Sequence, residues 1–556
     1  MSRSALFTRR WVVPAVLAVG LAAAAVVLVF VGSPRAPAPQ LSAAQDLPKD
    51  RMKAPEFPEK VDWLNTAGPI KLADLKGKIV LLDFWTLCCI NCIHILPDLA
   101  KLEKKYEKEL VVIGVHSAKF ENEKDTKSIR KAVLRYEIAH PVVNDGDHKI
   151  WDAFEVSSWP TYAVIDAEGH FVGVTSGEGQ LELLDKVIGK LVAEAKDKKV
   201  LNDKPMRFDL IRYREAGDTP LFFPGKTLAD EKTDRLVIAD STHHRVIVTN
   251  LKGEKKAVIG NGTPGNKDGK FADVQFDDPQ GLALDGDTLY IADRKNHVLR
   301  AADLKAGTVK TVAGTGEQAR DTRNIDKDNP GEPLKTGLNS PWDLLKVGDT
   351  LFIAMAGHHQ IWALDLKANK VYAFAGTGRE NIDDGPVYAA NFGQPSGLSA
   401  DDKYLYVADS EGSAIRRVPL NGEGRVTTLV GSPGRGSLFY FGDEDGDAEK
   451  AKLQHALGVV AHGGKLLIAD TYNSKLKEYD PATKKVKTLL GGEAKDPAFN
   501  EPAGMSVAAG KLYVADTNAH RIRVVDLKTN AVSTLDLKGV EPPPPQKEWL
   551  PPKKEK

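Results

Sequence analysis

The sequence predicts a multidomain protein in which an α/β domain is followed by an all-β, six-bladed β-propeller, with a transmembrane helix at the N-terminus. Three observations carry this prediction: an uncharged apolar run near the N-terminus, alternating strand and helix patterns over residues 56–198, and a strand phrase that recurs after residue 207. With 556 residues, the chain is long enough for two or three domains, each with its own hydrophobic core.

The first residues predict a membrane anchor. Arg3, Arg9 and Arg10 precede an uncharged, mostly apolar run at 11–32, and a helix of that length crosses a hydrocarbon core of about 30 Å. Because arginines favour the cytoplasmic side, we expect a single-pass membrane protein with both domains periplasmic or otherwise extracytoplasmic. The alternative is a cleaved signal peptide and a secreted protein, although the prolines after the run make a poor cleavage site.

The rest of the chain divides into patterned regions joined by linkers. An apolar run at 79–84 indicates a strand buried on both faces, and helical spacing follows from Cys89 to about Tyr106. The predicted order is an anchor at 1–32, a linker at 33–55, the α/β domain at 56–198, a linker at 199–206, the propeller at 207–538 and a Pro/Lys-rich tail at 539–556.

The propeller is predicted from an internal repeat. One strand phrase occurs six times, at intervals of 46 to 62 residues, from Leu-Val-Ile-Ala-Asp at 236–240 to Leu-Tyr-Val-Ala-Asp at 512–516. Several copies follow a Pro-x-Gly-Leu phrase. A period of this length, made of short strands and polar turns, is typical of propeller blades, so six copies predict six blades.

Composition excludes some functions. Lys plus Arg and Asp plus Glu number 76 each, so there is no basic excess to favour a nucleic-acid partner. The three cysteines, Cys88, Cys89 and Cys92, lie within five residues. Disulfides that staple a fold are spread along the chain, so clustered cysteines indicate chemistry instead.

Cys89-Ile90-Asn91-Cys92 follows a buried strand and begins a helix. A helix N-terminus stabilises a thiolate, so we expect Cys89 to attack and Cys92, one turn later, to resolve the mixed disulfide. The alternatives are a buried pair or a zinc pair, but only His94 is near enough to add a fourth ligand. Haem attachment needs a histidine directly after the second cysteine, and none stands there. We therefore predict no metal and no cofactor.

The segment 83–92, with Pro97 five residues on, resembles the thioredoxin active site, and its longer spacing to Pro160 resembles membrane-anchored TlpA/ResA-type proteins. The resemblance implies that Asp83 accepts the proton of Cys92. It also implies that Trp159-Pro160 forms a cis-proline loop that faces the cysteines and contacts substrate. Combined with the later repeats, Cys-Cys-Ile-Asn-Cys resembles the thioredoxin-plus-NHL-repeat-containing protein family.

Two redox-support residues leave alternatives open. Cys88 stands where thioredoxins usually have Trp, and it is either a third redox thiol or a packed side chain. Asp83 lies in an apolar strand, so desolvation should raise its pKa above the ~3.9 reference value. A carboxyl group poised in this way suits proton transfer from Cys92, whereas the alternative is a buried Asp that only bonds local backbone groups.

The first interpretation of the repeated blade residues is a structural one. Each phrase usually ends in Asp, a turn former, which we expect to pair with Arg245, Arg416 or Arg521 in the corresponding blades. The third blade departs from this rule and has Met355 there. His358 and His359 follow, and they are a candidate site at the propeller mouth. The acidic run at 443–447 does not fit the ligand spacing of an EF-hand.

These observations favour a thiol–disulfide oxidoreductase whose substrates are protein thiols or disulfides. It needs an electron donor or acceptor that the sequence does not identify, and its propeller is expected to recruit a protein partner. The alternative is a non-catalytic interaction scaffold with a redox-inert thioredoxin fold. A third interpretation, a hydrolase or lactonase in the propeller, lacks a recognisable set of metal-binding carboxylates in the sequence.

Overall fold

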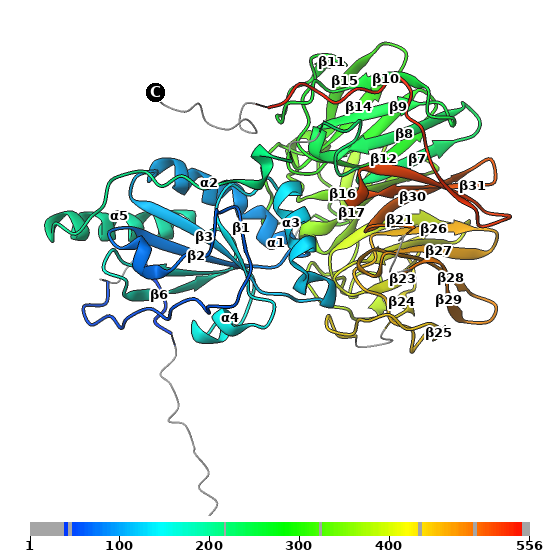
Figure 1. Ribbon diagram of the computed structural model, residues 1–556. Helices are drawn as coiled ribbons and strands as arrows, with labels where there is room; N and C mark the ends of the chain where they lie inside the picture. The colour runs from blue at the N-terminus through cyan, green and yellow to red at the C-terminus, as the bar shows by residue number, and fades with distance from the viewer. Residues whose placement is uncertain are drawn as a thin grey trace, which may run out of the picture. The chain divides into compact units, whose positions relative to one another are not determined.

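The first folded region is a six-stranded sheet with helices on both faces (Figure 1). The computed structural model describes residues 38–42, 47–215, 218–321, 325–431, 436–492 and 498–546. The strands are β1 (Trp63–Leu64), β2 (Ile79–Trp85), β3 (Leu110–His116), β4 (Val142–Asn144), β5 (Thr161–Ile165) and β6 (Phe171–Ser176). Their order is β1-β4-β3-β2-β5-β6, with β2, β3 and β4 parallel and the other three antiparallel to their neighbours.

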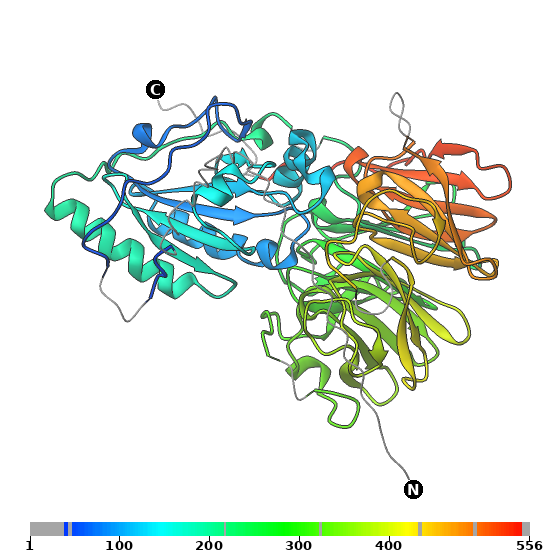
Figure 2. The same cartoon turned by 90° about the horizontal axis from the view of Figure 1, so that it is seen from below.

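The helices cover the sheet unequally. They are α1 (Ile90–His94), α2 (Leu96–Lys105), α3 (Thr126–Arg135), α4 (Lys149–Ala153) and α5 (Leu181–Asp197). α2 and α5 pack their leucines against Ile79, Leu81 and Val112 on one face, and Figure 2 shows α5 running along that face. α4 and the segment around Phe57 cover the opposite face.

The strand β2 positions the cysteine segment. All seven of its residues are buried, as the apolar run predicts, and the chain turns directly from Trp85 into α1. The single helix expected from Cys89 to Tyr106 is two helices that meet at Ile95. Pro97 lies in the first turn of α2, where its missing N–H breaks no helical hydrogen bond.

The second region is a six-bladed β-propeller, as predicted, counted over the part of the chain that the structure describes. In chain order its strands are: blade one, β7 (Lys226–Asp230), β8 (Arg235–Asp240), β9 (Arg245–Thr249) and β10 (Lys255–Ile259); blade two, β11 (Gly269–Lys270), β12 (Pro279–Asp285), β13 (Thr288–Asp293), β14 (Val298–Asp303) and β15 (Thr308–Ala313); blade three, β16 (Pro341–Val347), β17 (Thr350–Met355), β18 (Gln360–Asp365) and β19 (Lys370–Ala375); blade four, β20 (Gly385–Pro386), β21 (Pro395–Ala400), β22 (Tyr404–Asp409), β23 (Ala414–Pro419) and β24 (Arg425–Val430); blade five, β25 (Gly446–Asp447), β26 (Gly458–His462), β27 (Lys465–Asp470), β28 (Lys475–Asp480) and β29 (Lys485–Gly491); blade six, β30 (Pro502–Ala508), β31 (Lys511–Asp516), β32 (Arg521–Asp526) and β33 (Val532–Thr534).

A repeated hydrogen bond joins each blade to the next. Before the inner strand of every blade stands one residue in the left-handed conformation, and we call these six the top-face ring: Phe223, Asp278, Ser340, Gln394, His455 and Glu501. The backbone N–H of each donates to a side chain of the preceding blade, and those acceptors form the acceptor ring: His520, His244, His297, His359, Ser413 and Ser474. The bond from Phe223 N–H to His520 closes the circle between blades six and one.

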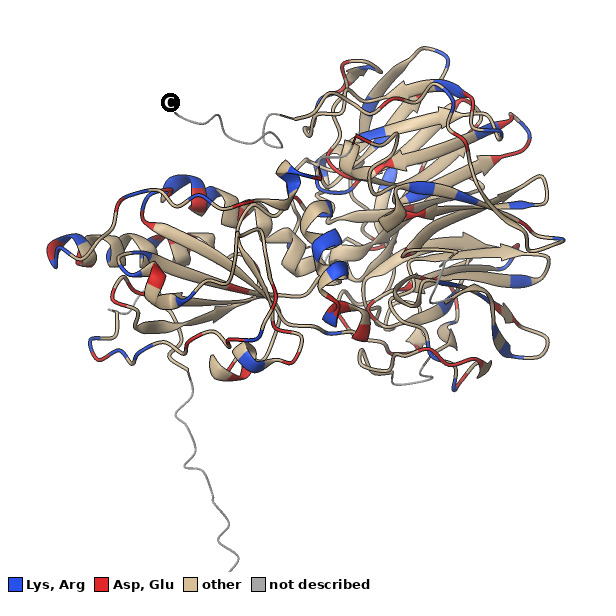
Figure 3. Ribbon diagram, viewed as in Figure 1, with Lys and Arg blue, Asp and Glu red and all other residues tan. Residues whose placement is uncertain are grey.

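The predicted anchor at 1–32 lies outside the described residues. Within the described ranges, no helix is long and apolar enough to cross a membrane. Figure 3 shows basic and acidic residues interspersed over both regions, in keeping with equal numbers of the two.

Candidate functional site

Cys89 caps the start of α1. Its sulfur accepts a hydrogen bond from the backbone N–H of Cys92 at 3.2 Å, so the spacing of the motif places both cysteines on one helical turn. Cys88, Cys89 and Cys92 are free thiols and are 2 %, 7 % and 1 % exposed. The nucleophile predicted from the sequence therefore stands at a helix N-terminus but is almost fully covered.

Burial sets the protonation of the thiols. Desolvation raises the pKa of Cys89, while its hydrogen bonds with Cys92 act in the opposite direction. Desolvation raises the pKa of Cys92 further, and the neighbouring Cys89 adds to that effect. In this closed arrangement both thiols hold their protons at neutral pH, and Cys89 is the easier of the two to ionise.

Asp83 lies on β2 behind the cysteines. It is 1 % exposed, and among the described residues neither carboxyl oxygen has a hydrogen-bond partner. Burial raises its pKa to about 7, with His140 acting in the opposite direction, which confirms the expectation of a raised pKa. The alternative of an Asp bonded to local backbone groups does not match this geometry.

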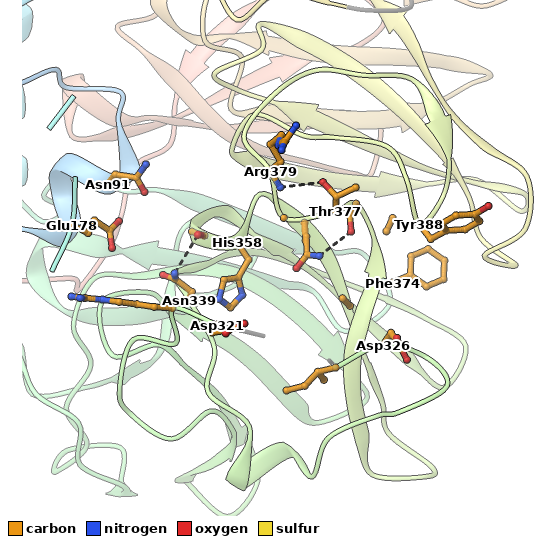
Figure 4. Close-up of a pocket in the computed structure, with 18 of the residues that line it drawn as sticks. Asn91, Glu178, Asp321, Asp326, Asn339, His358, Phe374, Thr377, Arg379 and Tyr388 are labelled. Atoms are coloured by element: carbon orange, nitrogen blue, oxygen red, sulfur yellow. Dashed lines mark hydrogen bonds between the residues drawn. The ribbon is translucent and has the colours of Figure 1, made fainter. Parts of the chain in front are cut away.

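The Trp159–Pro160 peptide bond is cis, as the resemblance implies. Both residues line a cleft of about 930 Å³, and Asn91 from between the cysteines joins them on that wall. Blade three, the loop after it and the start of blade four supply the opposite wall, with Phe374, Thr377, Arg379 and Tyr388 labelled in Figure 4. Tyr388 is 80 % exposed, so the cleft offers exposed aromatic surface.

The top-face ring of the propeller covers the cysteine segment. The side chain of Gln394 accepts from Ile90 N–H at 2.8 Å and donates to the Cys88 carbonyl at 3.0 Å. Ser340 contacts His94 Nε2 at 2.6 Å, and Glu501 accepts from the Asn122 side chain at 3.1 Å.

A buried ion pair reinforces this contact. Lys119 and Glu411 join the two regions with side chains only 5 % and 4 % exposed. Burial opposes ionisation of both groups, but their mutual attraction raises the pKa of Lys119 and lowers that of Glu411. The pair therefore stays charged inside the interface. Sequence patterns single out none of Gln394, Lys119 and Glu411.

Cys88 faces the propeller axis rather than the cleft. It lines a small cavity of about 40 Å³ together with Arg135, Arg294 and Tyr472. Its N–H donates to Glu123, and desolvation, aided by Glu123, raises its thiol pKa well above the usual value. The geometry favours the interpretation of Cys88 as a packed side chain.

The two histidines of the third blade have different surroundings. His359 belongs to the acceptor ring and receives the N–H of Gln394, which is a structural role. His358 lines the cleft, contacts the Ala319 carbonyl at 2.8 Å and stacks on Trp362. Burial lowers the pKa of both to about 4, so both are neutral at pH 7.

The predicted ion pairs of the blades are present. Arg245, Arg416 and Arg521 lie 2.8, 2.9 and 2.7 Å from the aspartates of their own blades. In the acidic run at 443–447, Asp443 pairs with Lys475 and Lys477. Over the described part of the chain, no three His, Cys, Asp or Glu side chains are grouped so that they could hold a metal ion.

Comparisons with known proteins agree with this architecture. Residues 77–171 match a thioredoxin-like family and residues 499–525 match an NHL repeat. NHL repeat-containing protein 2 of Homo sapiens is 43% identical over 494 residues, which cover 82% of this chain and 67% of that protein. The chain belongs to the NHL repeat-containing protein 2 family.

Two further relatives match nearly all of the chain and its first domain, respectively. The chloroplastic protein SUPPRESSOR OF QUENCHING 1 of Arabidopsis thaliana is 44% identical over 517 residues, or 88% of this chain and 48% of that protein. The chain thus spans about half of the plant relative and two thirds of the human one. Thiol-disulfide oxidoreductase YkuV of Bacillus subtilis is 31% identical over 147 residues, or 26% of this chain and 98% of YkuV.

These findings correct the predicted localisation. A single-pass membrane protein with both domains periplasmic was expected, but the described residues contain no helix able to cross a membrane. The family relatives are an NHL-repeat protein and a protein named as chloroplastic, neither of them named as a membrane protein. The expectation rested on Arg3, Arg9 and Arg10 and the run at 11–32, which lie outside the described residues.

Proposed function

We propose that this protein is a thiol–disulfide oxidoreductase that acts on disulfides of other proteins. The observation that carries the proposal is Cys89 at the N-cap of α1, with the Cys92 N–H 3.2 Å from its sulfur. That N–H stabilises a thiolate on Cys89, and helix geometry keeps Cys92 close enough to attack next.

The reaction proceeds in two exchanges. The Cys89 thiolate attacks one sulfur of a substrate disulfide, and the other substrate sulfur leaves as a thiolate. Cys92 then attacks Cys89, which releases the second substrate thiolate and leaves a Cys89–Cys92 disulfide. A dithiol electron donor is needed to restore the reduced pair.

The cleft supports a protein substrate. It has room for a polypeptide segment, and its walls carry Trp159, Phe374 and Tyr388, rigid aromatic side chains of the kind enriched in binding surfaces. The propeller therefore supplies half of the substrate site. Because Cys89 is 7 % exposed, attack requires the propeller face to move away from the cysteine segment.

The full-length protein should reduce insulin disulfides when dithiothreitol is supplied, with turnover followed by turbidity. We expect Cys89→Ser to abolish turnover and Cys92→Ser to accumulate mixed disulfides that are visible on non-reducing gels. Cys88→Ser is the matched control and should retain most of the activity. Equal turnover by wild type and Cys89→Ser would contradict the proposal.

A second candidate function, a non-catalytic scaffold, is favoured by the burial of all three thiols. It predicts that Cys89 stays unreactive in the presence of disulfide substrates. Trapping of a substrate protein by Cys92→Ser, and its loss in Cys89→Ser/Cys92→Ser, separates the two functions.

A further inference from the structure

A group of buried polar atoms behind Cys92 has no hydrogen-bond partner within the described protein. Both oxygens of Asp83, Nε1 of Trp85 and both ring nitrogens of His140 belong to this group. The three residues are 1 %, 3 % and 3 % exposed. Buried polar groups are nearly always satisfied, by protein or by internal water, so such a concentration beside a reactive thiol calls for a functional explanation.

Gly114 keeps the space between these groups open. It is the neighbour of Asp83 across the β2–β3 pair, so a side chain there would stand beside the Asp83 carboxyl group. A Cβ on Gly114 would lie 2.9 Å from Trp85 Nε1 and 3.5 Å from His140 Nε2. Because Gly114 has no side chain, the Trp85 indole and the His140 imidazole can approach the backbone next to Asp83.

His140 also contacts a partly exposed carboxylate. Its Nδ1 lies 3.4 Å from Oε1 of Glu103, whose side chain is 28 % exposed. His140 and Glu103 both line a cavity of about 230 Å³ between α2 and blade two, with His94 and Lys295 on its wall. Asp83 interacts electrostatically with both Cys92 and His140, and His140 in turn pairs with Glu103, so these groups follow one another from the thiol to the partly exposed α2.

We propose that His140 carries the proton of Cys92 from Asp83 to Glu103 and the cavity. The inference rests on the proposed function. As Cys92 attacks the mixed disulfide on Cys89, its S–H proton passes to the Asp83 carboxylate, while the Cys89–substrate bond breaks and the substrate leaves as a thiolate. In neutral His140 with its proton on Nδ1, the Nε2 atom then accepts the Asp83 proton, and the Nδ1 proton moves to Glu103 and solvent.

The electrostatics suit this transfer. Burial raises the pKa of Asp83 to about 7. Burial alone would lower the pKa of His140, but the Glu103 and Asp83 carboxylates raise it above its usual value. Donor and acceptor therefore exchange a proton near neutral pH without a large barrier. Tyr162 also faces Asp83 from β5, but its raised pKa keeps it protonated and out of the exchange.

Stopped-flow mixing of the reduced full-length protein with dithiobis(nitrobenzoate) separates the steps. A first release of nitrothiobenzoate reports attack by Cys89, and a second reports attack by Cys92, so Cys92→Ser should lack the second. We expect His140→Phe to slow the second release about tenfold or more at pH 7 and to leave the first within about twofold, since proton transfer contributes about 10²–10⁴-fold in rate. Gly114→Ala, which fills the space, should slow the second release as well.

Two further variants test the role of the imidazole. Added imidazole should restore the second release in His140→Gly, and Glu103→Gln, on the partly exposed α2, should slow it without loss of folding. His170→Gln removes a partly exposed histidine of the same domain as a matched control and should change neither phase. Unchanged second-phase rates from pH 6 to 9 in both His140→Phe and Gly114→Ala would overturn the relay. An absent first phase in wild-type protein would instead contradict the proposed function.

Discussion

Asp83 shows how one buried carboxyl group lowers the stability of the folded chain. Its carboxyl group is buried with no hydrogen-bond partner in the part of the chain that the structure describes, and its pKa is raised from 3.8 to about 7. Between these two values the unfolded chain releases a proton that the folded chain keeps. Stability therefore falls as pH rises through this range and stays low above it, by about 4 kcal/mol in total.

Asp83→Asn should remove this penalty, because asparagine keeps the shape and never ionises. We expect the free energy of unfolding to rise by about 2–4 kcal/mol at pH 8 and to change little at pH 4. Denaturant unfolding of both proteins at the two pH values, followed by tryptophan fluorescence, measures the difference. A pH-independent difference would mean that Asp83 is not protonated in the way its surroundings indicate.

The third blade shows why a departure from a pattern need not mark a ligand site. Met355 replaces the repeated Asp, and its sulfur accepts the Asn339 N–H at 3.4 Å. Trp362 occupies the β-sheet position that holds Arg300 and Arg416 in blades two and four and is fully buried. Met355 and Trp362 therefore replace the buried Asp–Arg ion pair with apolar side chains, and such a replacement is often neutral or stabilising.

At the scale of elements, the acceptor ring holds neighbouring blades together through side chains that accept a backbone N–H. Four of the six acceptors are histidines and two, Ser413 and Ser474, are serines. Burial lowers the pKa of His359 to about 4 and those of His297 and His520 to about 3. The imidazoles of these three histidines therefore remain neutral acceptors at pH 7. The two serines show that a smaller side chain can accept the same backbone hydrogen bond.

The acceptor ring predicts that two substitutions of His359 differ in stability. His359→Ala leaves the Gln394 N–H without its acceptor and should cost about 1–3 kcal/mol more than His359→Ser, which keeps one. Lowering the pH should reduce the free energy of unfolding of the wild type more than that of either variant. The unfolded chain binds a proton near pH 6.5 but folded His359 binds it only near 4, so wild-type stability falls as pH drops through that range. Unfolding of the three proteins at pH 7 and 4.5 tests this, and equal pH dependence in His359→Ser would contradict it.

In the molecule as a whole, local sequence patterns predict the two folds, but they do not predict contacts between residues that are far apart in the chain. The strand phrase gives six blades because every copy repeats the same short-range burial, and the cysteine spacing places both thiols on one turn. Gln394 and Ile90, in contrast, are 304 residues apart, and their contact depends on how two domains dock. In the sequence, Gln394 is distinguished only as the residue before the inner strand of its blade, Pro395-Ser396-Gly397. Each of the other five blades also has a residue at this position, so the position alone does not identify the contact.

This docking predicts that the propeller controls access to Cys89. Gln394→Leu keeps the bulk but leaves the Ile90 N–H and the Cys88 carbonyl unpaired in a buried interface, a loss of about 1–3 kcal/mol for each group. The open arrangement should become more populated, and alkylation of Cys89 by iodoacetamide should accelerate about tenfold or more, as measured by mass spectrometry. Gln454→Leu is the matched control, because Gln454 lies on the same face but bonds Asn122 N–H, away from the cysteines. A similar acceleration in both variants would assign the effect to general loosening of the interface, and no acceleration in Gln394→Leu would mean that its two hydrogen bonds do not hold the cysteine segment closed.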